Sequence, residues 1–167
     1  MRAIGVRVEK DKVHWSVVEG TPEQPVLVAD DKFSAPKTYD VSAQLAWYRK
    51  RVRTLIEEYA VDHVAVRYAE TFLRHKLKPN VLASMYARAR IEGVVVEAAA
   101  SLNVPVLTGT LGTISAGLGS RRAKSYLESG EIRGIDLNGK PTNRREAILT
   151  AAAALAGEEE TKDGRQG

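Results

Sequence analysis

At 167 residues, with 44% hydrophobic and 28% charged residues, the chain has the size and composition of one globular domain with its own core. It contains no cysteine, which excludes disulfide bonds and thiolate metal sites and fits a reducing compartment. The net charge of +4 permits a nucleic acid partner without requiring one.

The first 33 residues predict three β-strands. RAIGVRVEKDKVHWSVVEG, residues 2–20, alternates between apolar and polar positions and is rich in β-branched side chains. This pattern favours a hairpin of two strands, separated by the polar stretch from Glu9 to Lys12. The turn sequence GTPEQP follows, and PVLVADDKF, residues 25–33, predicts a third strand.

Helical and extended patterns alternate between residues 41 and 109. Residues 41–60 predict a helix with an apolar face, and Asp40 or Ser42 is placed to cap its first turn. That face consists of Leu45, Tyr48, Val52, Leu55, Ile56 and Tyr59. The next predicted elements are a buried strand (62–69), a loop (73–80), a long helix (81–103) and a fifth strand (104–109).

The C-terminal part contains two further predicted helices. Residues 110–120, TLGTISAGLGS, predict a glycine-rich connector, and the short helix after it is expected to end at Gly130. Residues 132–142 predict a polar loop or a short extension, and NRREAILTAAAALA predicts a last helix that begins near Asn143. The polar tail, residues 157–167, is expected to be disordered.

The element order βββαβαβαα predicts a single α/β domain over residues 1–156. We expect a mixed five-stranded sheet, its first three strands antiparallel, with helices on both faces. The beginning, MRAIGVRV, lacks the apolar stretch of a signal peptide, and no segment approaches the roughly 20 apolar residues that span a bilayer. We therefore expect a cytoplasmic protein with no membrane partner.

The chain contains five stretches, AIGVRVEKDKVHWSVVEG, HVAVRYAETF, ARARIEGVVVEAAASLNVPV, TISAGLGSRRAKSYL and NRREAILTAAAALA. Together they resemble the RuvC-type Holliday-junction resolvases of the RNase H-like superfamily. AIGVRVEKDKVHWSVVEG is similar to their first hairpin, and HVAVRYAETF is similar to their fourth strand. ARARIEGVVVEAAASLNVPV resembles the helix and strand that follow. TISAGLGSRRAKSYL resembles their glycine-rich connector, and NRREAILTAAAALA their last helix. The resemblance covers the chain up to Ala156 and implies an RNase H-like fold.

In that family, four acidic residues hold two Mg²⁺ ions that cleave a phosphodiester. The resemblance places those four positions on Arg7, Arg67, Asn143 and Glu146 of this sequence. Three of the four acids are therefore replaced, and an arginine stays protonated and cannot ligate a metal. We expect no metal and no other cofactor at these degenerate positions.

Two interpretations of these four positions are open. Two arginines and an asparagine suit a phosphate or another anion. Alternatively, Glu146 neutralises one arginine in an internal ion pair, because buried charges must be paired. If Mg²⁺-dependent cleavage persists, Glu146 and Glu70 are the candidate catalytic residues, whereas Glu9 and Asp11 are further possible stand-ins.

Basic residues elsewhere are candidates for nucleic acid contacts. The loop RHKLKPN and the two arginines after GLGS supply them: Arg74, His75, Lys76, Lys78, Arg121 and Arg122. For GLGS, a plain turn is the alternative interpretation. The run RKRVR, residues 49–53, fits either a nucleic acid patch or the solvated face of a helix, and Val52 on the core face supports the latter.

The sequence thus favours a catalytically degenerate RuvC-like protein that acts as a nucleic-acid-binding or accessory protein. Its expected partners are DNA or RNA, or a nucleic-acid-processing complex. The alternatives are an active Mg²⁺-dependent, structure-specific endonuclease with a rebuilt acid set, and a purely structural interaction module. The apolar helix and the dimeric state of the resolvases lead us to expect a homodimer, and Trp15 and Trp47 are expected in the core or at a subunit interface.

Overall fold

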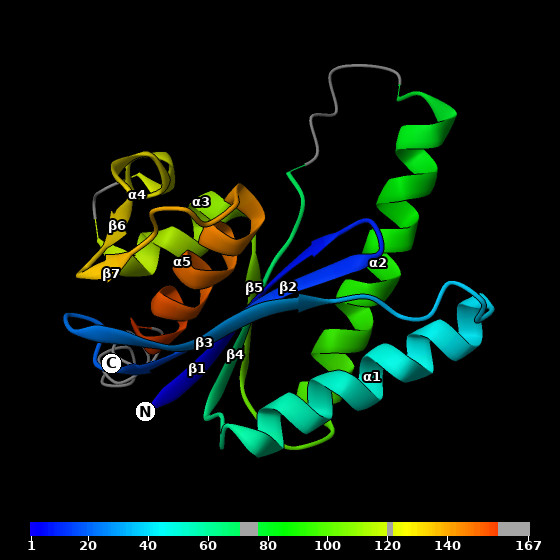
Figure 1. The fold of residues 1–167 in the computed structure, drawn as a ribbon, viewed down its shortest axis with the longest axis horizontal. Coiled ribbons are helices and arrows are strands. Elements are labelled where there is room, and N and C mark those ends of the chain that lie inside the picture. The colour runs from blue at the N-terminus through cyan, green and yellow to red at the C-terminus, as the bar shows by residue number, and fades with distance from the viewer. Residues whose placement is uncertain (71–76, 120–121, 157–167) are drawn as a thin grey trace, which may run out of the picture.

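The computed structural model of the protein describes residues 1–70, 77–119 and 122–156. A five-stranded sheet of order β3-β2-β1-β4-β5 forms its centre (Figure 1). The strands are β1 (Arg2–Glu9), β2 (Lys12–Gly20), β3 (Pro25–Phe33), β4 (His63–Arg67) and β5 (Val106–Gly109). The first three pair antiparallel, whereas β4 is parallel to both β1 and β5, which confirms the predicted mixed sheet.

Helices cover both faces of this sheet (Figure 1). One face carries the long helices α1 (Val41–Glu58) and α2 (Pro79–Ala100), which pack against each other. The other face carries a helical layer and a small hairpin: α3 (Leu111–Ser115), the 3-10 turn η1 (Ala116–Leu118), α4 (Ala123–Ser129), β6 (Glu131–Ile132), β7 (Ile135–Asp136) and α5 (Thr142–Ala156). Among the described residues, no helix is both long and apolar enough to cross a membrane.

The two faces follow from the alternation of side chains along β1. Ile4, Val6 and Val8 point into the core under α1 and α2, whereas Ala3 belongs to the core under α5. Because successive side chains in a strand point to opposite faces, Gly5 and Arg7 lie on the α5 side with Ala3. The same strand therefore supplies apolar packing on one face and a charged side chain on the other.

Gly5 lets α5 lie directly on β1. A Cβ atom at this position would lie 2.1 Å from the carbonyl oxygen of Ala147 and 2.3 Å from the amide nitrogen of Ala151. Both are backbone atoms of the helix, so no side-chain rotation relieves the overlap. The buried alanines of α5, which include Ala151, complete this close contact. The small residues on the helix and the glycine on the strand thus fix the distance between α5 and the sheet.

The C-terminal part differs from the sequence prediction in local detail. The connector predicted at residues 110–120 contains α3 and η1, because the Thr110 side chain caps the helix by accepting from the Thr113 amide. The polar loop or short extension predicted at residues 132–142 includes most of the β6–β7 hairpin, whose two turn residues, Arg133 and Gly134, both have positive φ. The last helix, α5, begins at Thr142, next to the predicted Asn143.

Both tryptophans pack within the core under α1. Trp15 is buried with its ring centroid 5.8 Å from that of Tyr59. Trp47 is partly buried against the same core and contacts Phe33 edge to face at 5.7 Å. The predicted core position of both side chains is therefore confirmed. Asp40, one of the two predicted caps, caps α1 by accepting from the Ala43 amide.

Candidate functional site

Arg7 and Arg67 stand beside each other where β1 and β4 end. The two strands are parallel, and the two residues are partners in the register. Both side chains point to the α5 face, since each lies two residues after a small residue, Gly5 or Ala65, on that face. The predicted juxtaposition of the two arginines is therefore confirmed.

The carboxylate of Glu146, on α5, lies between these two arginines. The Nε atom of Arg7 donates a hydrogen bond of 2.6 Å to Glu146 Oε2. The Nε atom of Arg67 lies 3.4 Å from the same oxygen, as an ion pair without hydrogen-bond alignment. All three side chains are nearly buried. Glu146 thus bridges two arginines, and the predicted internal ion pair is a three-member network.

The positive charge of Arg67 is fixed despite its burial. Burial lowers the pKa of Arg67, Glu146 raises it, and the neighbouring charge of Arg7 lowers it further. A guanidinium nevertheless stays protonated at physiological pH, because its pKa starts far above neutrality. Two permanent positive charges therefore remain at the ends of β1 and β4, with one carboxylate between them.

A second buried ion pair, from α2, belongs to the same cluster. Arg88 Nε donates a hydrogen bond of 2.8 Å to Glu92 Oε1. Burial lowers the pKa of Arg88, and the charge of Arg7 lowers it further; burial raises the pKa of Glu92, which the hydrogen bond from Arg88 opposes. Sequence reasoning missed this pair, although its i,i+4 spacing on a predicted helix was the available signal.

The remaining acids near the network have other partners. Glu70 lies beyond the end of β4, largely exposed, with Oε1 4.0 Å from Arg67 Nη2. Glu9 contacts His14, with 2.9 Å between Glu9 Oε2 and His14 Nε2. That hydrogen bond lowers the pKa of Glu9, and Asn143 contributes to the same direction of shift. The side chain of Asn143 is therefore directed to Glu9.

Asp30 ties the start of α5 to strand β3. It accepts hydrogen bonds of 2.8 Å from Arg144 Nη1 and 2.9 Å from Lys140 Nζ. Burial raises the pKa of Asp30, but the hydrogen bonds from Arg144 and Lys140 outweigh burial and lower the pKa below its ordinary value. This anchor was not predicted, since its partners lie more than a hundred residues apart in the chain.

The residues at this place do not fit a pair of divalent cations. Hard cations need several carboxylate oxygens, whereas the Glu146 oxygen nearest the strands is already engaged by Arg7 and Arg67. Glu70 and Glu146 contact different nitrogens of Arg67. Within residues 1–70, 77–119 and 122–156, no three His, Asp or Glu side chains are grouped as metal ligands.

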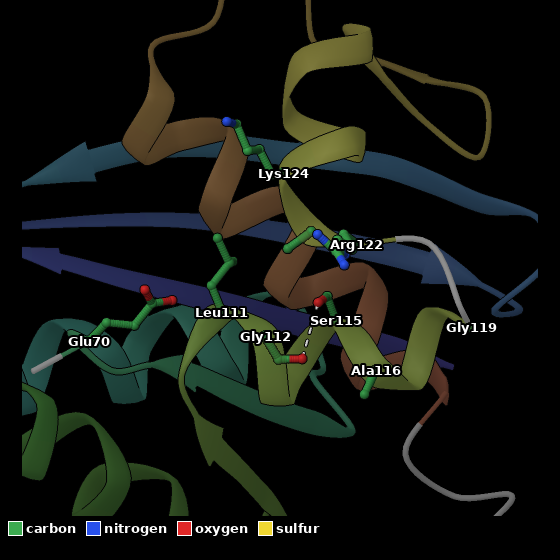
Figure 2. Close-up of a pocket in the computed structure, with 9 residues that line it drawn as sticks. Glu70, Leu111, Gly112, Ser115, Ala116, Gly119, Arg122 and Lys124 are labelled. Atoms are coloured by element: carbon green, nitrogen blue, oxygen red, sulfur yellow. Dashed lines mark hydrogen bonds between the residues drawn. The ribbon is translucent and has the colours of Figure 1, made fainter. Parts of the chain in front are cut away.

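Two surface hollows with basic linings flank the network. The β1–α2 cleft, of about 790 Å³, is lined by Arg7, Glu9, Lys10, Asn80 and Arg88 together with apolar and small residues of α2. The α3–α4 hollow, of about 520 Å³, is lined by Glu70, Arg122 and Lys124 together with residues of α3 and η1. Figure 2 shows Glu70 at one side of this second hollow, with Arg122 and Lys124 across from it.

The predicted basic contacts have different outcomes. Arg122 lines the α3–α4 hollow, and Lys78 is the N-cap residue of α2. Arg74, His75, Lys76 and Arg121 lie outside the described residues. In the run at residues 49–53, Arg49 pairs with Glu97 of α2 at 2.6 Å while Val52 is buried, so this run is the outer face of α1.

Comparison with solved structures identifies the fold. RuvC from Thermus thermophilus superposes with a TM-score of 0.72 at 17% identity, covering 96% of this chain and 98% of that one. The same protein in complex with a Holliday junction substrate gives a TM-score of 0.69 at 18% identity, with 93% of each chain covered. The yeast mitochondrial Holliday junction resolvase gives 0.62 at 12% identity, with 98% and 81% covered. No protein-family model and no curated protein matches the sequence.

Proposed function

We propose that this chain, which has an RNase H-like fold of the RuvC type, binds nucleic acid without cleaving it by metal-dependent hydrolysis. One observation carries the proposal: Glu146 bridges Arg7 and Arg67 where the resemblance to resolvases places metal ligands. In a two-metal nuclease, cations neutralise the phosphate oxygens. Here fixed guanidinium groups occupy that place, and they attract a phosphate without activating water.

The two basic hollows support binding to a sugar–phosphate backbone. Arg7, Lys10 and Arg88 line one of them, and Arg122 and Lys124 line the other. Positive side chains in hollows on either side of a strand end suit a backbone that runs across the surface, and the net charge of +4 acts in the same direction. A neighbour with the same fold was solved with a Holliday junction substrate, which favours branched DNA as the first substrate to test.

A second candidate is a protein-interaction module, because the first half of α2 exposes apolar side chains. Val81, Leu82 and Tyr86 are exposed there, and Leu77 is exposed just before the helix. Such a surface suits a protein partner, which includes a second copy of this chain. The expected homodimer and an accessory role in a nucleic-acid-processing complex both belong to this candidate.

The decisive experiment measures binding and cleavage on the same nucleic acids. Fluorescence anisotropy with a four-way junction, a matched duplex and a single strand, each as DNA and RNA, is recorded between about 50 and 200 mM salt. We expect binding with a steep salt dependence. The double substitution Arg122→Gln, Lys124→Gln should weaken binding and reduce the salt slope by roughly 2, at about 0.9 per phosphate contact. Lys50→Gln, on the exposed face of α1, is the matched control.

The cleavage arm adds Mg²⁺ or Mn²⁺ and then EDTA. We expect intact substrates under all three conditions. Cleavage that needs the metal and disappears in Glu70→Gln would instead establish an active endonuclease with a rebuilt acid set. Failure to bind any of the nucleic acids, together with a defined oligomer or a stoichiometric protein partner, would establish the interaction module.

A further inference from the structure

The buried arginines at the strand ends have hydrogen-bond donors without acceptors. Arg67 is 8% exposed, and its Nε finds no hydrogen-bond acceptor among the described residues. The same holds for Arg88 Nη2. A buried charged donor without an acceptor costs free energy. Of these two residues, Arg88 lines the β1–α2 cleft, whereas Arg67 is not among its lining residues and contributes through its charge.

The charges of the cluster leave a surplus of one. Three buried or nearly buried arginines, Arg7, Arg67 and Arg88, face two buried carboxylates, Glu146 and Glu92. The surplus is met by Glu70 across 4.0 Å, from a side chain that is 43% exposed. An exposed carboxylate at that distance is screened by water and contributes little. The cluster therefore suits one further negative charge brought by a ligand.

The β1–α2 cleft gives such a ligand access to the cluster. Arg7 and Arg88 form part of its lining, and Lys10, Asn80 and Glu9 line it as well. The negative charge of Glu9, which contacts His14, is balanced by the positive charge of the neighbouring Lys10, so the surplus of the cluster is unchanged. Asn80 belongs to the first turn of α2, whose N-cap residue, Lys78, caps none of the first amides with its side chain. The α2 residues of this cleft, from Asn80 to Arg88, form one flank of the helix. Ligand oxygens in this cleft meet donors from both β1 and α2.

We propose that the β1–α2 cleft binds one phosphate group, held by Arg7 and Arg88 and backed by the charge of Arg67. The inference rests on the proposed function, because a nucleic acid backbone is the source that would supply the phosphate. Guanidinium groups pair with phosphate through two parallel hydrogen bonds. The surplus of one positive charge matches the single charge of an internal phosphodiester better than the nearly double charge of a terminal phosphate.

Glu70 competes with the phosphate in this arrangement. It faces Arg67 from the surface, and it is not a ligand of the phosphate. The substitution Glu70→Gln removes this competing negative charge and keeps the shape of the side chain. It should therefore tighten phosphate binding severalfold. A metal-binding role for Glu70 predicts no such gain, so the sign of this effect separates the two interpretations.

The test uses NMR spectra of arginine Nε–Hε groups in the full chain, titrated with inorganic phosphate, with the dinucleotide TpT and with 5′-thymidylate. We expect the Arg67 and Arg88 signals to shift in a saturable way. TpT contains only a phosphodiester, and 5′-thymidylate contains only a terminal phosphate. The ligand that binds more tightly therefore identifies which kind of phosphate the cleft prefers. Arg88→Gln combined with Glu92→Gln should weaken binding at least tenfold without leaving a buried charge unpaired. Lys124→Gln, in the α3–α4 hollow, should leave phosphate affinity unchanged.

Signals that do not move at any phosphate concentration, or equal affinity in the Arg88→Gln, Glu92→Gln variant, would overturn the inference. If the four-way junction still bound in that case, the proposed function would stand and the phosphate site alone would fall. If phosphate and TpT bound while no junction, duplex or single strand did, the site would stand and the proposed function would fall.

Discussion

Arg7 and Arg67 lie side by side on parallel strands, and their Nε atoms lie 2.6 and 3.4 Å from the same oxygen of Glu146. Two like charges at this spacing in a nearly buried place repel each other, so the carboxylate between them stabilises the arrangement. The same three side chains therefore determine the stability of the strand ends and the ligand chemistry that the place allows.

Removing the bridging carboxylate should destabilise the protein strongly. Glu146→Gln leaves two nearly buried arginines without their shared counter-charge, and we expect a loss of about 3 kcal/mol in the free energy of unfolding. Urea denaturation followed by circular dichroism measures it. Glu70→Gln, at the exposed acid, should cost less than about 1 kcal/mol.

A triple substitution tests whether repulsion causes that loss. Arg7→Met, Arg67→Met and Glu146→Leu together remove all three charges and retain side-chain volume, so the triple variant should regain most of the stability that Glu146→Gln loses. A triple variant as unstable as the single one would show that Glu146 contributes through something other than charge.

Alanine at Gly5 should prevent α5 from docking. Its Cβ would overlap the backbone of α5 at Ala147 and Ala151, and we expect Gly5→Ala to cost at least about 3 kcal/mol or to abolish folding. Gly93→Ala is the matched control: Gly93 lies in α2, where an added Cβ would meet no atom within 4 Å, and the substitution should stabilise by about 0.5–1 kcal/mol. Thermal unfolding of both variants measures these changes in stability. A Gly5→Ala variant that loses little stability would show that α5 and β1 are not in this contact.

Asp30 should make the protein sensitive to acid. Its pKa is lowered by Arg144 and Lys140 against the effect of burial, so folding favours the deprotonated form. The resulting stability is present above the ordinary value of 3.8 and is lost as the pH falls through the lower folded value. Asp30→Asn should cost about 2 kcal/mol at neutral pH and show a shallower loss of stability below about pH 4. Asp31→Asn, at a side chain 70% exposed, is the control; identical pH profiles for wild type and Asp30→Asn would contradict the assignment.

Divalent cations should not stabilise the folded protein. A ligand present at about 100 times its dissociation constant raises the free energy of unfolding by about 2.7 kcal/mol. We expect no rise in melting temperature with Mn²⁺ or Mg²⁺, because Glu146 is engaged by arginines. Inorganic phosphate should raise it. A saturable rise with Mn²⁺ that disappears in Glu70→Gln would place a metal at this site after all.

Much of the fold was predictable because its signals are local. The alternation in residues 2–20 and the apolar face of residues 41–60 determine which side chains can be buried, and the structure buries them there. The elements that the sequence did not predict depend on local backbone conformation and helix capping, which residue composition does not reveal. Gly134 and Arg133 have the backbone conformation of a tight hairpin turn, and the Thr110 cap begins a helix in what resembles a glycine-rich connector.

The candidate site was predictable in part. The resemblance to the resolvases implied that Arg7 and Arg67 lie on adjacent strands, and the register of β1 and β4 confirms it. The membership of Arg88 and Glu92 was not predictable, because it depends on how far the start of α2 extends along the end of the sheet. The anchor from Asp30 to Arg144 depends in the same way on where α5 crosses β3.

The sequence by itself determined the order of strands and helices, the face of β1 on which Arg7 lies and the presence of arginine at positions 7 and 67, because side-chain period and residue identity are properties of the chain. The tertiary structure decided that one Glu146 oxygen lies near both arginines, that Arg67 Nε is buried without an aligned acceptor, and that the β1–α2 cleft gives access to the cluster. Those are distances between residues far apart in sequence, and they are set by the packing of α5 and α2 against the sheet.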